Sequence, residues 1–163
     1  MTAWRLVLFA SRLTPHASRL TSMTRIDFYV APETDTSPLP TACRLCEKAV
    51  SGGQRVHVHA PDEAVAQAFD RALWTYKQGG FIGHERVNDT EDQSLATVLI
   101  GSAEPGPAHQ DVLLNFGSDV PAFFSRFERV LEVVHGDEAA RAQSRARFKF
   151  YRDRGYTLET HKL

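Results

Sequence analysis

Two hydrophobic patterns alternate along the first two thirds of the chain. Short runs rich in β-branched and aromatic residues predict strands, and they occur at residues 26–30, 55–60, 96–101 and 112–116. Apolar residues that recur every three or four positions predict helices at residues 41–50 and 62–74. Because strands and helices follow each other in turn, the order favours a parallel sheet whose strands are connected by helices.

The last third of the chain predicts two helices in succession. The first begins at Pro121, and its apolar residues at three- and four-residue spacing are Phe123, Phe124, Phe127, Val130, Leu131 and Val134. The second begins after Asp137, which can cap it, and ends before Gly155. The whole pattern predicts a single α/β sandwich with a mainly parallel central sheet and two consecutive C-terminal helices.

Residues 1–22 differ from the rest of the chain. They contain three arginines, no acidic residue and one short apolar run at residues 6–10. A secretory signal needs roughly 7–15 apolar residues, so this run is too short for one. Because a strand pattern begins directly after Met23, we expect residues 1–22 to be a disordered extension or to precede the natural start. Residues 23–163 are then one domain.

Composition and charge exclude several classes of protein. Nineteen basic and 20 acidic residues give a net charge of −1, which argues against a surface that coats nucleic acid throughout. Two cysteines exclude a disulfide framework, and no run approaches the ~20 apolar residues of a membrane span. Residues 141–163, however, carry seven basic and two acidic side chains. Any binding to an acidic partner is therefore expected at the C-terminal end.

Motifs for catalysis or cofactor binding are weak. Neither dinucleotide-binding nor phosphate-binding glycine motif occurs. Cys43 and Cys46 have redox spacing, but they fall within an apolar helix and are expected to be buried thiols. His57 and His59 share a strand face and offer two metal ligands without an evident third. No cofactor or metal is therefore expected, and a nucleotide-using α/β enzyme is kept as the alternative interpretation.

The final helix carries the most informative pattern. At 100° per residue, four cations and one aromatic residue share a stripe roughly 100° wide: Arg141, Arg145, Phe148, Lys149 and Arg152. The opposite side, which we expect to be buried, contains Ala139, Ala142, Ala146 and Phe150. An aromatic residue among cations favours a ligand that is both acidic and hydrophobic. An acidic peptide with an apolar end and single-stranded nucleic acid both fit, and the overall charge favours the peptide.

A second candidate surface follows the helix at residues 62–74. Trp74, Tyr76, Phe81 and Ile82 are large apolar residues at a helix end and in the loop beyond it. Such residues either cover the core or provide the aromatic anchors of a protein interface.

Five segments together resemble the chi subunit family of bacterial DNA polymerase III: residues 23–30, 70–74, 98–101, 120–130 and 151–156. The resemblance implies a Rossmann-like, non-catalytic and cytoplasmic accessory subunit of the replicative holoenzyme. It also implies two partners. One is the acidic C-terminal tail of single-stranded DNA-binding protein, which ends in Pro-Phe, and the other is the psi subunit of the clamp loader. Contact with DNA would be indirect, through these partners, and no membrane is involved.

By position, the resemblance assigns roles to two groups of residues. The tail site would contain Val134, Arg141, Arg145, Phe148, Lys149, Tyr151 and Arg152, of which Val134, Phe148 and Tyr151 would form the pocket for the terminal Phe. The psi site would contain Trp74, Phe81 and Ile82. Two departures concern the psi side: Gly83 replaces a proline common in the family, and the following loop is unusually acidic at Asp89, Glu91 and Asp92.

Overall fold

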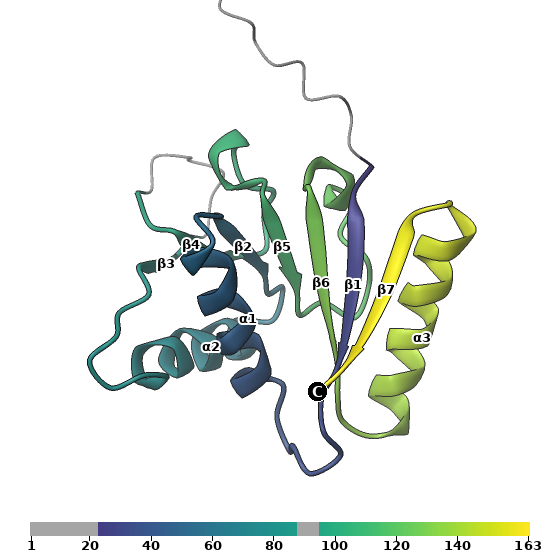
Figure 1. The fold of residues 1–163 in the computed structure, drawn as a ribbon, viewed down its shortest axis with the longest axis horizontal. Helices are drawn as coiled ribbons and strands as arrows, with labels where there is room; N and C mark the ends of the chain where they lie inside the picture. The colour runs from purple at the N-terminus through teal and green to yellow at the C-terminus, as the bar shows by residue number, and fades with distance from the viewer. Residues whose placement is uncertain (1–22, 88–94) are drawn as a thin grey trace, which may run out of the picture.

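The computed structural model describes residues 23–87 and 95–163 (Figure 1). The predictions for residues 1–22 and for the acidic loop lie outside this range. The strands are β1 (Arg25–Val30), β2 (Val56–His59), β3 (His84–Arg86), β4 (Val98–Gly101), β5 (Val112–Asn115), β6 (Arg129–Val134) and β7 (Thr157–Lys162). The helices are α1 (Leu39–Ser51), α2 (Glu63–Thr75) and α3 (Glu138–Asp153), with 3-10 turns at Pro107–His109 and Phe124–Arg126.

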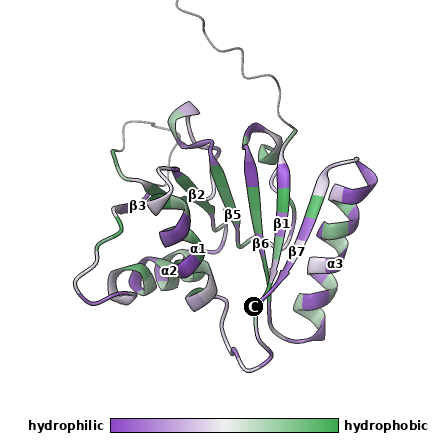
Figure 2. Cartoon of the chain, viewed as in Figure 1, coloured by the Kyte–Doolittle hydropathy of each residue, from purple (hydrophilic) through white to green (hydrophobic). Residues whose placement is uncertain are grey.

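All seven strands form one sheet in the order β3-β4-β2-β5-β6-β1-β7, and every described pair is parallel. The parallel α/β architecture predicted from the sequence is therefore confirmed. Helices α1 and α2 cover one face of the sheet, and α3 covers part of the other (Figure 1). Hydrophobic residues concentrate in the central strands, as expected for strands buried on both faces (Figure 2).

Local sequence signals explain where α2 and α3 begin. The Asp62 side chain accepts a hydrogen bond from the Ala64 amide at 2.8 Å, and Asp137 accepts one from the Ala140 amide at 3.0 Å. These caps satisfy amide groups that a helix leaves unpaired in its first turn. Asp137 therefore fixes the start of α3 as the sequence predicted.

The helix predicted from Pro121 to Val134 is wrong. Phe124–Arg126 forms a 3-10 turn and Arg129–Val134 forms β6, between β1 and β5. The segment is apolar on both sides, so its spacing fits a buried strand as well as a helix. Three valines in six residues favour the strand because β-branched side chains pack well on a sheet. Where the sequence predicted two consecutive C-terminal helices, the structure therefore has one strand, β6, followed by one helix, α3.

The two outer strands were not predicted. β3 has only three residues, and β7 has the sequence TLETHK, in which polar residues predominate. Edge strands face solvent on more than one side, so they lack the apolar runs that identify central strands. Their existence depends on pairing with β4 and β1, which the local sequence does not reveal.

The buried side of α3 also differs from the prediction. Ala139, Ala142 and Ala146 are exposed, whereas Ser144, Arg147 and Tyr151 face the sheet. The reason is a buried acidic partner: the Arg147 Nε donates to Glu132 Oε2 on β6 at 2.8 Å. Pairing makes burial of a cation tolerable, and the helix is rotated accordingly.

Candidate functional site

A pocket of about 250 Å³ lies between α3 and the carboxyl ends of β1 and β6. Its lining residues are Phe28, Val30, Val134, Arg141, Ser144, Arg145, Phe148 and Thr160. Four of the predicted tail-site residues are thus brought together, from β6 and α3. β1 adds Phe28 and Val30, and β7 adds Thr160; the sequence pattern did not predict these three residues as part of the site.

The floor of the pocket is apolar. The Phe148 ring packs edge-on against Phe28, with ring centroids 5.2 Å apart. Phe148 is only half-buried, so one part of its ring contacts the core while another part lines the pocket. Val30 and Val134 are the last residues of adjacent parallel strands and complete the apolar wall. The pocket can therefore accept an apolar side chain.

Two guanidinium groups stand beside this apolar floor. The Arg145 side chain is 63% exposed and forms an ion pair with Glu138, whose side chain is 80% exposed. Arg141 donates from Nε to the Gly136 carbonyl at 3.2 Å. Exposed ion pairs contribute about 0–1 kcal/mol, so Glu138 can readily be exchanged for a carboxylate of a ligand. The pocket thus combines an apolar cavity with exchangeable positive charge.

Three other predicted tail-site residues are placed differently. Tyr151 is fully buried, and its hydroxyl donates to Glu132 Oε1 at 2.9 Å, so the prediction that it forms the pocket wall is wrong. Lys149 and Arg152 are exposed on α3 but do not line the pocket. They continue the line of positive charge toward the end of the helix.

A buried polar cluster lies beneath α3. The Glu132 carboxylate is inaccessible to solvent and accepts hydrogen bonds from Arg147, Tyr151 and the Asn115 side-chain amide, the last at 3.1 Å. Burial raises the pKa of Glu132, although the adjacent Arg147 charge opposes this shift. The pKa of the Tyr151 hydroxyl is raised mainly by burial. The sequence signal for this cluster was a glutamate within the apolar run at residues 130–134.

The predicted second surface is an exposed aromatic pair. Trp74 at the end of α2 is 59% exposed, Phe81 is 69% exposed, and their ring centroids lie 5.2 Å apart. His84 supports them: its ring centroid is 5.1 Å from that of Trp74, and its Nδ1 is 2.7 Å from the Ile82 carbonyl. Ile82 is partly buried and lines a pocket of about 150 Å³ beside Phe81.

The loop that presents Phe81 is held in place at Gly83. The Gly83 carbonyl accepts hydrogen bonds from the Thr97 hydroxyl at 3.1 Å and from the Val98 amide at 3.0 Å. These hydrogen bonds hold the segment in place, although Gly83 replaces the proline common in the family.

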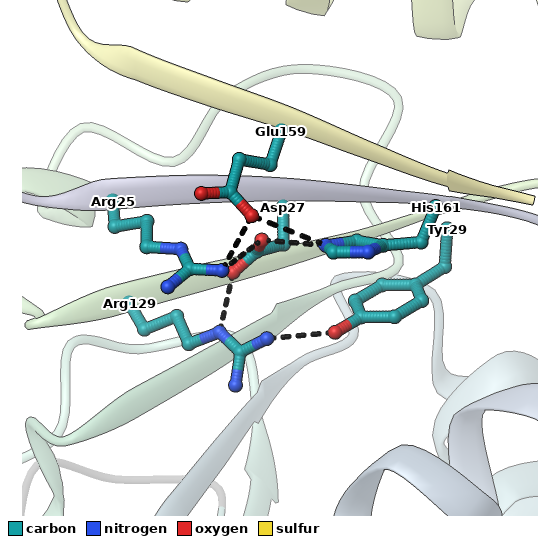
Figure 3. Close-up of polar contacts among 6 residues, drawn as sticks. All are labelled: Arg25, Asp27, Tyr29, Arg129, Glu159 and His161. Carbon is teal, nitrogen blue, oxygen red and sulfur yellow. Dashed lines mark hydrogen bonds and ion pairs between the residues drawn. The ribbon is translucent and has the colours of Figure 1, made fainter.

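A polar network surrounds Asp27 of β1, on the sheet face opposite to that of Phe28 (Figure 3). Asp27 is fully buried and contacts Arg25 on its own strand, Arg129 on β6 and His161 on β7. Burial acts to raise the pKa of Asp27, but hydrogen bonds from His161 and Arg129 outweigh it and hold the pKa below its usual value.

The same network contains a possible set of metal ligands. Single ligand atoms of Asp27, Glu159 and His161 lie within 4.8 Å of one another. The Arg25 guanidinium already lies between the carboxylates, 3.1 Å from Asp27 Oδ1 and 2.7 Å from Glu159 Oε2. Since an arginine supplies the positive charge there, the arrangement is better described as an ion-pair network than as a metal centre.

His57 and His59 do not gain a third ligand within the described ranges. His57 is 1% exposed and packs between the rings of Phe123 and Phe127, with centroid distances of 5.9 and 6.1 Å. Burial lowers the pKa of His57 to about 3, so its ring is neutral at physiological pH. The structure places this histidine in the core, as a neutral packing residue.

Cys43 and Cys46 are both free and buried within α1. Burial raises the pKa of the Cys43 thiol to about 11, and it also raises that of Cys46. Thiolates, rather than thiols, carry out redox exchange. The environment therefore suppresses the redox chemistry that the spacing alone would allow.

A crevice of about 390 Å³ opens at the carboxyl ends of β5 and β6, where α/β proteins commonly bind ligands. Arg147 lines it, but its guanidinium already donates to Glu132, to the Ser118 carbonyl at 3.0 Å and to Ser144 Oγ at 3.2 Å. The buried cation is therefore used to hold α3 on the sheet.

Among the helices of residues 23–87 and 95–163, none has the length and hydropathy of a membrane span.

The fold and its two surfaces define a class: a parallel α/β protein with a basic, apolar-floored pocket and a separate exposed aromatic pair. Residues 23–159 match the family model described as DNA polymerase III chi subunit, HolC. The chain belongs to this family, whose members are subunits of the DNA polymerase III holoenzyme and act in DNA replication.

Curated relatives agree with this assignment. The chain is 42% identical over 142 residues to DNA polymerase III subunit chi of Pseudomonas aeruginosa, covering 86% of this chain and 98% of the relative. It is 25% identical over 137 residues to subunit chi of Haemophilus influenzae, covering 83% of this chain and 95% of the relative. The resemblance inferred from the sequence is therefore confirmed.

A solved structure of T4 UvsW is similar in fold. Its TM-score is 0.60 at 8% identity, and the match covers 88% of this chain but only 42% of that one. At this identity the likeness concerns the fold alone.

Proposed function

We propose that the chain is a non-catalytic adaptor of the replicative holoenzyme. It binds the acidic, Pro-Phe-ending tail of single-stranded DNA-binding protein through α3 and the psi subunit of the clamp loader through the Trp74 surface. It thereby links the clamp loader to protein-coated single-stranded DNA. Residues 23–163 act as one domain in this function.

The pocket between α3 and the sheet is the observation that carries the proposal. A terminal Phe needs an apolar cavity, which Val134 and Phe148 provide. Its carboxylate and the acidic residues before it need cations, which Arg141 and Arg145 provide at the rim. Lys149 and Arg152 lie farther along the same helix, within reach of the upstream part of an extended acidic tail.

The Trp74 and Phe81 pair supports the second half of the proposal. Two large aromatic side chains, each more than half exposed and in contact with each other, are typical anchors of a protein interface. The adjacent pocket lined by Phe81 and Ile82 offers space for an apolar side chain of the partner. These features lie on α2 and the loop after it, apart from α3.

A bridging assay tests the proposal. Immobilised psi should capture a labelled acidic peptide ending in Pro-Phe only when the chain is added. Trp74→Ala should lose psi and keep the peptide, whereas Phe148→Ala should lose the peptide and keep psi. If both variants bridge as well as wild type, the proposal is wrong.

Two competing functions would each give a different measurable response from the purified chain. Direct binding to single-stranded DNA would give a rise in anisotropy of a labelled oligonucleotide with the isolated chain. A nucleotide-using enzyme would be stabilised by its nucleotide, by about 2.7 kcal/mol at 100 times the dissociation constant. The adaptor proposal expects neither response.

A further inference from the structure

Within residues 23–87 and 95–163, no strand pairs with the outer edge of β7. β7 is the last strand of the sheet and pairs only with β1 among the described residues. The Leu163 amide donates to the Val30 carbonyl at 3.2 Å, so that amide points toward β1. Because successive amides of a strand point in opposite directions, those of Leu158, Thr160 and Lys162 point outward. Each of these residues presents one N–H and one carbonyl to an additional strand.

This open edge lies on the same side as the cations of α3. Taking 100° per residue, the sheet-facing residues Ser144, Arg147 and Tyr151 occupy one side of the helix. Arg147 reaches toward Ser118 after β5, so the other flank of α3, which carries Arg145, faces β7. Thr160 of β7 lines the same pocket as Arg145 and confirms this orientation. A peptide that leaves the pocket on this flank runs between the cations and the edge of β7.

The direction of such a peptide is also fixed. The pocket lies at the carboxyl ends of the strands, next to the first half of α3. The second half of α3, with Lys149 and Arg152, leads through residues 154–156 to the beginning of β7. A peptide whose last side chain fills the pocket therefore has its preceding residues beside Leu158 and the start of β7. Its backbone runs parallel to β7.

We propose that an acidic peptide seated in the pocket adds to β7 as an eighth, parallel strand. The inference rests on the proposed function and deepens it, because it specifies how the peptide backbone is recognised. Alternate side chains of the added strand would point toward α3, where acidic groups meet Lys149 and Arg152. Recognition by strand addition explains why the line of positive charge extends beyond the pocket.

Amide hydrogen exchange tests this inference directly. On addition of an acidic peptide ending in Pro-Phe, the amides of Leu158, Thr160 and Lys162 should become protected. Those of Glu159 and His161 point toward β1 and serve as the internal control, with little change expected. Unchanged exchange at all three outward amides, in a sample saturated with peptide, would overturn strand addition.

A series of peptides with single backbone esters provides the second test. An ester removes one N–H donor and leaves the side chains intact. Esters that face β7 should weaken binding about two- to tenfold, the loss expected for one hydrogen bond, whereas those at the intervening positions should not. Equal affinity across the series would refute strand addition alone. Failure of the unmodified peptide to bind would refute the proposed function as well.

Discussion

Removal of the buried Arg147 guanidinium should destabilise the protein strongly. Arg147→Met keeps much of the side-chain volume but removes the charge that faces Glu132, which is fully buried. Breaking a buried ion pair by removing one partner costs about 3–5 kcal/mol, because the remaining charge is left without compensation. Of its hydrogen bonds within the described part of the chain, Glu132 would keep those from Asn115 and Tyr151. We therefore expect the free energy of unfolding to fall by at least 3 kcal/mol at pH 7.5.

The pH dependence of the free energy of unfolding provides a second test of the Arg147–Glu132 pair. Burial already raises the pKa of Glu132, and loss of Arg147 raises it further. A group whose pKa is higher in the folded state stabilises the fold below its unfolded pKa and loses that contribution as the pH rises. The variant should therefore be closest to wild type near pH 4.5 and lose stability relative to wild type toward pH 7.5.

Urea unfolding, followed by circular dichroism across this pH range, measures both effects. Glu132→Gln combined with Arg147→Met is the matched control, because the double variant contains no buried charge at this site. Its loss of stability should be smaller than the sum of the two single losses. A cost below about 1 kcal/mol for Arg147→Met at pH 7.5 would refute the role assigned to the pair.

Two further predictions concern the polar groups buried in the sheet. The pKa of His57 is about 3 in the folded state and near 6.5 in the unfolded state. As the pH falls from 6.5 to 3, wild type should therefore lose up to about 1.4 kcal/mol of stability per pH unit. The stability of His57→Phe should depend less on pH over this range. Asp27 has a lowered pKa, so its contribution is present above about pH 4 and is lost as the pH falls. Asp27→Asn removes the charge that Arg129 and His161 contact, so it should cost about 1.5–3 kcal/mol at pH 7, as expected for hydrogen bonds to a charged group. The variant should also lack the acid-induced loss, and an unchanged dependence of stability on pH below about pH 4 in urea titrations would contradict the assignment.

Four of the five inner strands, β1, β2, β4 and β5, and all three described helices could be predicted because their signals are local. Continuous apolar runs mark β4 and β5, and the aspartates at residues 62 and 137 mark helix starts. β6 was misread because an apolar segment buried on both sides has no decisive period. β7 could not be found, since its polar sequence becomes a strand only by pairing with β1.

The candidate site was predicted in part for a related reason. Helical geometry grouped Arg141, Arg145 and Phe148 correctly on one flank of α3. It could not show which flank faces the sheet, because that depends on Glu132 and its pairing with Arg147. Tyr151 was assigned to the pocket by the family resemblance, not by helical geometry, and it lies in the core.

Calorimetric titration of an acidic peptide ending in Pro-Phe tests the central claim most directly. Arg145→Ala should weaken binding by about 1.5 kcal/mol, roughly tenfold, as expected for a hydrogen bond to a charged group. Arg71→Ala, an equal change in charge on the exposed side of α2, should bind as wild type does. Deleting the terminal Phe from the peptide should abolish measurable binding to all three proteins. Equal affinities for the Arg145 and Arg71 variants, or full affinity without the Phe, would contradict the account.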